Sequence, residues 1–443
     1  MKKEALFVFL CFGVFCRGEA VSTHSLWPPL TTEAKPWAYW WWMGSAVDPE
    51  NLAAELSRYR DAGMGGVHVI PIYGAKSYES RYVRYLSKKF LRLLSYAAKK
   101  ARSLDMDLDM TLGTGWCFGG PWITEELSNL RVKFRTFNVS EGVVFKIKLN
   151  PRSQALLAYG RRGKVLDLRK FLQKGKVIWK APEGQWQIYE VWWEPSGRKV
   201  KRAAPGGGGY MLNLIYPKAI QRHLLRFDEA FSLYEGKLPR AFYHDSYEYA
   251  TDWSPEFFAE FRKRCGYDLR QYLPALFGRG EKEMVARVKA DYRRTVSQLI
   301  EESLTLWVEW SHKKGVLTRN QAHGSPGNLL DLYSLADIPE TEMFHTDRDE
   351  LIAKFASSAA HLSGKKLVAA ETGTWLKEHF HVRLSDLKDL VDQLFVSGVN
   401  HVIYHGTCYS PNDAPWPGWL FYASTQMNPR NSIWRDAPLL NAY

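Results

Sequence analysis

Carboxylate residues follow two short apolar segments of this sequence. Residues 241–248 (AFYHDSYE) lead into Asp245 and Glu248, and residues 366–372 (KLVAAET) lead into Glu371. An apolar run that ends in acidic residues is typical of a buried barrel strand whose last residues reach an active site. Two carboxylates supplied by separate strands can act as the acid and the base of glycoside hydrolysis. The sequence therefore indicates acid–base chemistry on a sugar.

Polar residues also follow other strand-like segments. Glu340 and Glu342 lie in DIPETE, and His405 ends VNHVIYH. If these segments are parallel barrel strands, their C-terminal ends meet at one face. Carboxylates crowded there among cations and rings can have pKa values far enough apart that one stays protonated while another stays ionised. The structural alternative for each glutamate is an ion pair at a strand end.

The candidate site residues have two kinds of chemistry. Glu248, Glu371 and Glu342 are suited to acid–base catalysis. Aromatic rings offer sugars a flat apolar surface, although many are core residues, and imidazole, amide and carboxylate groups bind hydroxyls. Asp245 and Glu248 carry the hard oxygen atoms that calcium prefers, so they are also the candidate metal ligands. The candidates for substrate binding are Trp41, Trp116, His244, Asp245, Asn320, His323, Trp375 and His405.

An alternation of strand-like and helix-like segments must position these residues. Asp48 and Ser87 have the side chains of helix caps, and each is followed by apolar residues at helical spacing. Eight strands that mostly alternate with helices predict an α/β fold, a (β/α)8 TIM-like barrel. The expected strands cover 37–43, 67–72, 104–112, a segment at Phe242, 315–322, 337–342, 367–371 and 399–405.

Three aspartates share one face of the third expected strand. Asp105, Asp107 and Asp109 alternate along LDMDLDMTL. Unpaired charge inside a barrel is costly. We expect the first two at the open bottom of the barrel and Asp109 in an ion pair with a base; the alternative is a role for Asp109 near the site.

The pattern changes between residues 130 and 214. Short alternating or aromatic segments such as VVFKIKL and QWQIYEVWWE are separated by Gly, Pro and Asn, which predicts an antiparallel β module inserted between barrel strands 3 and 4. Residues 131–202 carry a net charge of +13, equal to that of the whole chain. Such a segment can attract an acidic polysaccharide, while a merely solvated basic surface is the alternative. We expect a barrel from 21–129 and 215–443, with the basic module at 130–214.

The first 20 residues have the features of a secretion signal. Lys2 and Lys3 precede an apolar run too short to span a bilayer, and small residues precede a cleavage after Ala20. This predicts a secreted or periplasmic protein; lipoprotein anchoring at Cys16 is less supported because bulky Phe15 precedes it. Nucleic acid is an unexpected partner for a secreted protein, and no later segment resembles a membrane span. The composition, 46% hydrophobic and 24% charged, is that of a globular chain.

Several long motifs occur in a fixed order along the chain. They are PWAYWWWMG, AGMGGVHV, TGWCFGGPW, HDSYE, ADIPETEMF, SSAAHLSGKKLVAAET and GVNHVIYHG. In these motifs residues 36–443 resemble the catalytic region of glycoside hydrolase family 106, the α-L-rhamnosidases. The resemblance implies a (β/α)8 barrel, an inverting mechanism, calcium dependence and action on rhamnose in pectins such as rhamnogalacturonan. Family members are usually longer, with β-sandwich domains after the barrel, and we expect none of these domains within residues 1–443.

The resemblance also implies residue roles. Glu248 and Glu371 match the family's key carboxylates, and Glu342 is a third acidic site residue. By analogy with other barrel hydrolases, we expect Glu248 to be the acid and Glu371 the base that activates water; inversion needs these carboxyls ~6.5–9.5 Å apart. Two alternatives stay open: a glycosidase for another sugar, and a truncated sugar-binding protein without activity.

Overall fold

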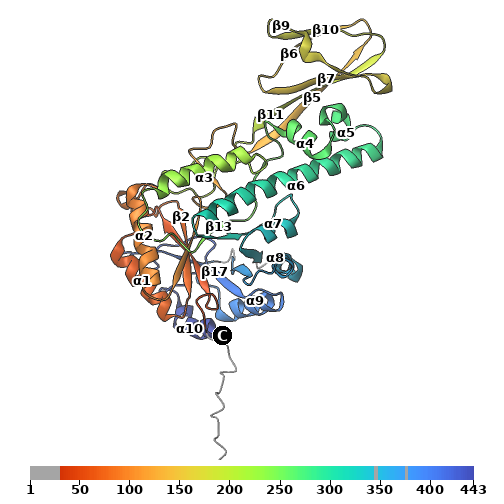
Figure 1. Ribbon diagram of the computed structural model, residues 1–443. Helices are drawn as coiled ribbons and strands as arrows, with labels where there is room; N and C mark the ends of the chain where they lie inside the picture. Colours follow the sequence, from red (N-terminus) through yellow and green to blue (C-terminus); the bar gives the residue numbers. More distant parts are fainter. Residues whose placement is uncertain (1–29, 344–347, 375–377) are drawn as a thin grey trace, which may run out of the picture.

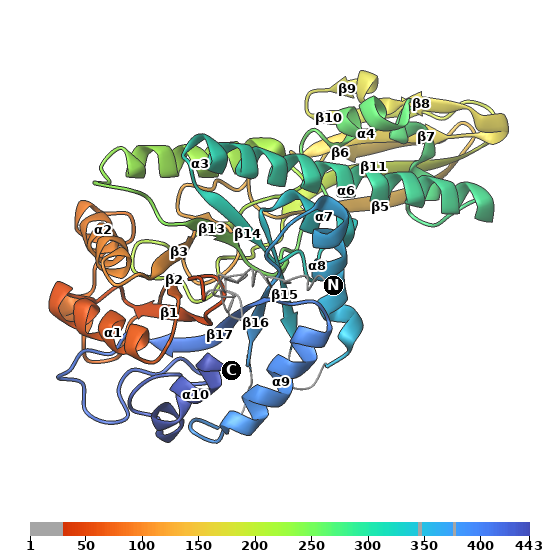
Figure 2. The same cartoon turned by 60° about the horizontal axis from the view of Figure 1, so that its bottom comes forward.

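The computed structural model describes residues 30–343, 348–374 and 378–443. Its centre is a closed barrel of parallel strands in the order β1-β17-β16-β15-β14-β13-β3-β2, as predicted. Figure 2 shows these strands with helices around them. The strands are β1 (Trp37–Met43), β2 (Gly66–Ile72), β3 (Asp107–Thr111), β13 (Ala241–His244), β14 (Leu317–Asn320), β15 (Ile338–Met343), β16 (Ala369–Thr372) and β17 (His401–Cys408).

Helices connect successive barrel strands. The caps expected at Asp48 and Ser87 are present, since their side chains accept hydrogen bonds from the backbone N–H of Asn51 (2.9 Å) and Phe90 (3.2 Å). The helices are α1 (Pro49–Asp61), α2 (Lys88–Arg102), α3 (Pro217–Phe231), α4 (Phe257–Cys265), α5 (Leu273–Leu276), α6 (Lys282–Lys313), α7 (Leu329–Leu335), α8 (Glu350–Ser363), α9 (Leu384–Val396) and α10 (Ala437–Ala442). None of the helices in the described ranges combines the length and apolar character needed to cross a membrane.

β1 explains how an aromatic run becomes a barrel strand. All seven residues are buried, because the barrel interior covers one face and the helices cover the other. Trp40 faces outward, and its indole N–H donates to Glu55 of α1 over 2.9 Å. Tyr39 and Trp41, on the opposite face, contact one another inside the barrel, with ring centroids 6.1 Å apart. Because side chains alternate between the two faces of a strand, every second residue of β1 packs against the helices and the others face the barrel interior.

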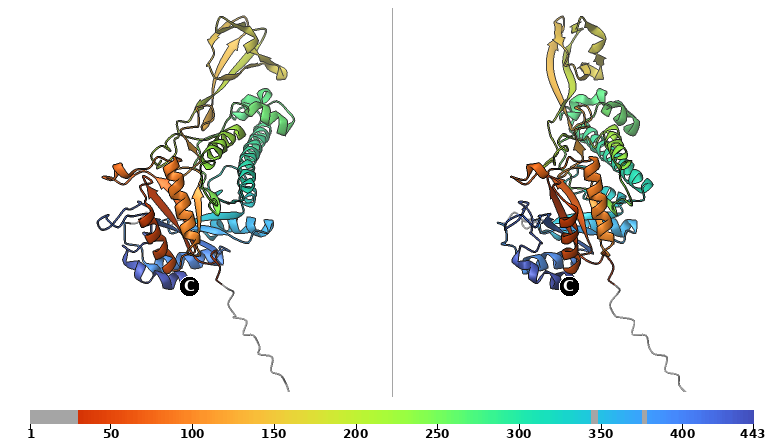
Figure 3. Two further views of the ribbon diagram at one scale, coloured as in Figure 1. Left: turned by 60° about the vertical axis from the view of Figure 1, so that its left-hand side comes forward. Right: turned by 90° about the vertical axis from the view of Figure 1, so that its left-hand side faces the viewer.

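An antiparallel module interrupts the barrel between β3 and α3. One sheet has the order β5-β11-β7-β8 and the other β6-β10-β9, and a separate small core that includes Trp179 and Ile188 lies in this module. Figures 1 and 3 show the module projecting away from the barrel beside α4 to α6. Phe134 stacks on Phe277, which follows α5, with ring centroids 3.7 Å apart. The strands are β5 (Leu130–Ser140), β6 (Val144–Lys148), β7 (Ser153–Tyr159), β8 (Val165–Asp167), β9 (Leu172–Gln173), β10 (Lys176–Lys180) and β11 (Gln185–Pro195). The domain boundaries at 130 and 214 stay a prediction.

Candidate active site

A cavity of about 180 Å³ lies at the C-terminal ends of the barrel strands. Its wall contains all three of the candidate catalytic glutamates together with aromatic rings from the first and last barrel units. The residues that line it are Tyr39, Trp41, Ile70, Gly115, Trp116, Asp245, Ser246, Glu248, Glu342, Glu371, Thr374, His405, Phe421, Tyr422 and Ala423. Residues far apart in sequence thus meet at the face where barrel enzymes carry their sites.

Two of these glutamates are direct neighbours across a strand pair. Glu342 of β15 is in register with Glu371 of β16, and both are almost fully buried. Burial raises the pKa of Glu342 well above its ordinary value, and the charges of Glu371 and then Asp245 add to the effect. Desolvation and the charge of Glu371 raise the pKa of Asp245 in the same way. Like charges this close oppose one another's ionisation, so burial and mutual repulsion act in the same direction on the pKa values of Glu342 and Asp245.

Glu371 is held by donors on both of its oxygens. Its Oε2 accepts hydrogen bonds from Tyr39 Oη at 3.1 Å and from Gln321 Nε2 at 2.8 Å. Its Oε1 accepts a hydrogen bond from the Thr374 hydroxyl. Such a set of donors suits the acceptor-only carboxylate form and fixes the orientation of the side chain.

His405 faces the same carboxylate. Its Nδ1 lies 2.9 Å from the carbonyl oxygen of Ala423, so Nδ1 carries a proton. Its Nε2 lies 3.5 Å from Glu371 Oε1. Burial lowers the pKa of His405, while the charge of Glu371 acts in the opposite direction. A second proton on His405 would therefore form an ion pair with Glu371 inside the cavity.

Glu248 differs from the buried glutamates. Its side chain is 36% exposed and forms an ion pair with Lys201, which comes from the segment that returns from the inserted module. Lys201 Nζ also lies 5.6 Å from the centroid of the Trp116 ring. Glu248 is thus placed at the rim of the cavity and not at its base.

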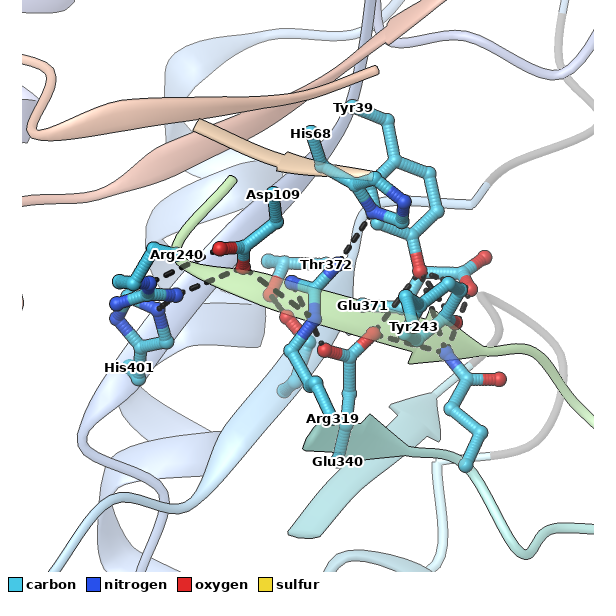
Figure 4. A network of polar contacts seen from close by, with 12 residues as sticks. Tyr39, His68, Asp109, Arg240, Tyr243, Arg319, Glu340, Glu371, Thr372 and His401 are labelled. Atoms are coloured by element: carbon cyan, nitrogen blue, oxygen red, sulfur yellow. Dashed lines mark hydrogen bonds and ion pairs between the residues drawn. The ribbon is translucent and has the colours of Figure 1, made fainter. Parts of the chain in front are cut away.

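A ladder of buried charges runs through the barrel interior beneath the cavity (Figure 4). Arg240 binds Asp109 through two hydrogen bonds of 2.9 and 2.7 Å, which confirms the expected ion pair of Asp109. Arg319 Nε lies 3.8 Å from Asp109, and its Nη1 lies 3.1 Å from Glu340 Oε2. The Gln321 amide donates to both Glu340 and Glu371, and the single Tyr39 hydroxyl lies within hydrogen-bond distance of both carboxylates. The ladder thereby connects the bottom of the barrel to the catalytic candidates.

The other two aspartates of the third strand also follow the expectation. Asp105 is exposed, Asp107 is intermediate and Asp109 is fully buried. Exposure therefore decreases from the bottom of the barrel inward, and only the deepest carboxylate needs two arginines.

Three of the expected substrate-binding rings line the cavity: Trp41, Trp116 and His405. Trp41 stacks on Phe421, with ring centroids 4.3 Å apart. Asp245 lines the cavity as well. Trp375, also expected there, lies outside the described residues.

His244 and Asn320, both expected to bind substrate, do not line the cavity. His244 Nδ1 lies 2.8 Å from Asn320 Oδ1, and the two residues are in register in β13 and β14. The His244 ring packs on Phe118, with centroids 4.6 Å apart, so it faces the outer layer. Burial lowers the pKa of His244 to about 4, which keeps it neutral. His323 is also absent from the cavity wall, and its carbonyl accepts a hydrogen bond from the backbone N–H of Tyr247.

Tyr39 and Thr374 are site residues that the sequence analysis did not select, and Gln321 was not among the candidates for a role in the site. Tyr39 could have been found from its spacing, since it lies two residues before Trp41 on the inward face of β1. Gln321 directly follows β14. Nothing in the sequence marks Lys201 as a site residue, because the folding of the inserted module, and not a barrel strand, brings it to the rim of the cavity.

The calcium site expected at Asp245 and Glu248 has oxygen donors of the right type. Among the described residues, however, no group of three or more His, Cys, Asp or Glu side chains is arranged to hold a metal ion. Lys201 also occupies Glu248. The calcium requirement therefore stays a prediction.

A (β/α)8 barrel with carboxylates and aromatic rings at the C-terminal mouth is the architecture of barrel glycoside hydrolases. The chain belongs to glycoside hydrolase family 106: the family's sequence profile, described as alpha-L-rhamnosidase, matches residues 28–159 and 152–442. The resemblance found in the motifs is thereby confirmed.

Similar proteins support the fold. The structure of a rhamnosidase from Novosphingobium sp. PP1Y matches with a TM-score of 0.75 at 19% identity, covering 94% of this chain and 60% of that chain. A beta-galactosidase from the psychrophilic Marinomonas ef1 matches with a TM-score of 0.52 at 10% identity, covering 92% of this chain and 59% of that one. A protein of Formosa agariphila named "Putative beta-glucuronidase" is 25% identical over 94% of this chain. This chain spans 40% of the length of that protein.

Proposed function

We propose that this chain is the catalytic region of an inverting α-L-rhamnosidase that removes terminal rhamnose from plant polysaccharide or glycosides. The observation that supports this most directly is the position of Glu371, fixed by three donors inside a cavity that Glu248 borders at the rim. Membership of family 106 supports the sugar. A volume of about 180 Å³ is below the ~300–1,000 Å³ usual for ligand pockets, which favours a single ring.

In the proposed mechanism Glu371 is the base. Its donors orient the carboxylate toward the cavity, where it activates a water molecule that attacks the anomeric carbon. Trp41 provides an apolar face for the sugar, and His405 lies beside the water-activating oxygen. Glu342 stays close by as a third acidic residue with a raised pKa.

Glu248 is the proposed proton donor, because the leaving group must depart through the rim at which it lies. Lys201 stabilises the carboxylate form of Glu248 in the free protein. Glu248 must therefore take up a proton as the substrate enters. Its nearest rival for this role is Glu342, whose pKa is raised by burial.

A leaving-group series distinguishes the two candidates. In Glu248→Gln we expect kcat/KM for an alkyl rhamnoside to fall by about 100- to 10,000-fold, because a poor leaving group needs the proton. The loss should be much smaller for 2,4-dinitrophenyl rhamnoside, because its leaving group, 2,4-dinitrophenolate, is a stabilised anion that needs no proton. Glu342→Gln is the matched variant. If Glu342→Gln alone has this dependence on the leaving group, the acid is Glu342.

Proton NMR of the first product formed tests the mechanism and the sugar. With 4-nitrophenyl α-L-rhamnoside, we expect β-L-rhamnose to appear first, before mutarotation. Initial release of the α-anomer would refute inversion. Aryl glycosides of other deoxy sugars and of glucuronic acid test whether the enzyme prefers a sugar other than rhamnose. Glucuronic acid is included because the Formosa agariphila protein is named a putative beta-glucuronidase. Binding without hydrolysis of any of them would instead favour the non-catalytic alternative.

We also propose that the protein is secreted or periplasmic and that it requires calcium. The secretion signal at residues 1–20 supports a secreted or periplasmic protein and lies outside the described residues. The calcium requirement is motivated by the family resemblance and by the oxygen donors of Asp245 and Glu248, and loss of activity in EDTA with its return on adding calcium is the test.

A further inference from the structure

The segment that returns from the inserted module forms part of the active-site rim. Lys201 forms a β-bridge with Trp116, and the carbonyl of Arg202 accepts the backbone N–H of Tyr73 at 3.0 Å. The carbonyl of Pro205 accepts the N–H of Tyr85 at 2.8 Å. A Cβ atom added at Gly115 would lie 1.8 Å from the Lys201 carbonyl oxygen, so backbones meet here without intervening side chains. This segment is therefore fixed against the loops that follow β2 and β3.

Arg202 is presented at this rim in a defined direction. Its backbone has φ 56°, an uncommon conformation for a residue with a side chain. Its guanidinium lies 4.7 Å from the ring centroid of Tyr422, which lines the cavity, and 6.0 Å from that of Tyr73. Ring stacking leaves the edge of a guanidinium available for a planar, bidentate partner such as a carboxylate.

The charge of Arg202 has no acidic partner among residues 30–343, 348–374 and 378–443. Arg202 is exposed, and no ion pair joins it to an acidic side chain within the described ranges. The neighbouring Lys201, by contrast, is occupied by Glu248. In the described part of the chain, Arg202 is thus a planar cation without an acidic partner, and it lies against an aromatic ring of the cavity wall.

The cavity wall contains four acidic residues, which are Asp245, Glu248, Glu342 and Glu371. They would repel a negatively charged group brought to the rim, whereas a neutral leaving group would feel no such penalty. A free cation at the point where the leaving group emerges offsets this repulsion. It also extends the basic character of residues 131–202 to the edge of the site.

We propose that Arg202 is a specificity-determining residue that binds the carboxylate of a uronic acid in the leaving group. This rests on the proposed rhamnosidase function and adds the chemistry of the neighbouring sugar. The arginine fork pairs with both carboxylate oxygens, while the Tyr422 ring supports the guanidinium from one face.

Binding to a catalytically disabled protein tests this without turnover. In the Glu371→Gln chain, calorimetry measures the Kd of a rhamnosyl uronic acid and of its methyl ester, which has the same skeleton without the charge. We expect the acid to bind about tenfold more tightly, and adding Arg202→Gln to remove this preference. Arg161→Gln, at an exposed arginine between β7 and β8, should keep it.

Equal binding of acid and ester, or an equal loss of both in Arg202→Gln, would overturn the assignment. If Arg202→Gln does not fold, salt provides the second measurement. At ~1 M NaCl the Debye length is about 3 Å, so the preference of the Glu371→Gln chain should shrink toward unity. A preference that persists unchanged in salt also overturns the proposal. Hydrolysis of a neutral aryl rhamnoside by the unmodified chain tests the proposed function separately.

Discussion

Glu371→Gln should lower kcat for 4-nitrophenyl α-L-rhamnoside by about 100- to 10,000-fold, the usual contribution of a general base. The amide keeps the size of the side chain and cannot take a proton from water. Its neighbours Tyr39 and Thr374 can still form hydrogen bonds with it, since hydroxyl groups both donate and accept. The loss should therefore be one of chemistry and not of folding.

Folding of this variant gives an independent readout. Substitution of Glu371 removes one of the charges that raise the pKa values of Asp245 and Glu342. We expect a thermal midpoint equal to or above that of the original chain, because crowded like charges oppose folding. Glu350→Gln makes the same exchange at an exposed helical pair with Lys354 and should leave kcat unchanged. Near-normal turnover by Glu371→Gln would remove Glu371 from the mechanism.

Among the substitutions proposed for this chain, Arg319→Met should cause the largest loss of stability, about 3–5 kcal/mol in the free energy of unfolding. Arg319 is fully buried and lies between Glu340 and Asp109. Its guanidinium carbon lies 4.5 Å from the centroid of the Tyr243 ring. Asp109 would keep both hydrogen bonds from Arg240. Glu340 would keep only the neutral donors Tyr39 and Gln321, so its charge would be buried without a counterion.

The loss should depend on pH in a predictable direction. Burial raises the pKa of Glu340, and the positive charge of Arg319 opposes that rise. Without Arg319 the folded state holds a proton on Glu340 that the unfolded state releases above about pH 4.3. The variant should therefore lose stability as pH rises through that value toward the raised pKa of Glu340.

Denaturant unfolding of a double variant isolates this cause. Arg319→Met with Glu340→Gln removes both charges, so it should recover part of the loss. Arg60→Gln is the matched surface control, because the Arg60–Asp61 pair is exposed, and it should change stability by less than about 0.5 kcal/mol. If the double variant is no more stable than Arg319→Met, the unpaired charge is not the reason.

The orientation of His244 could not be predicted from the sequence. Strand ends could be located from composition, but side chains alternate between two faces. Tyr243 and Arg319 are in register and contact each other in the barrel interior, whereas the next pair, His244 and Asn320, faces outward. Both pairs are polar or aromatic and lie one residue apart. A shift of one residue therefore separates a residue of the site from a residue that packs behind it.

The barrel and the acidic residues at its C-terminal face could be derived from the amino-acid sequence. Buried parallel strands require apolar runs, and the polar residues that end such runs in 241–248 and 366–372 meet at one face of a closed barrel. Which charges neutralise one another could be seen only in the folded chain. Lys201 reaches Glu248 from an inserted module, and Arg319 joins Asp109 to Glu340 across the interior. Coulomb interactions depend on distance in space and on burial, and neither can be obtained from spacing along a chain.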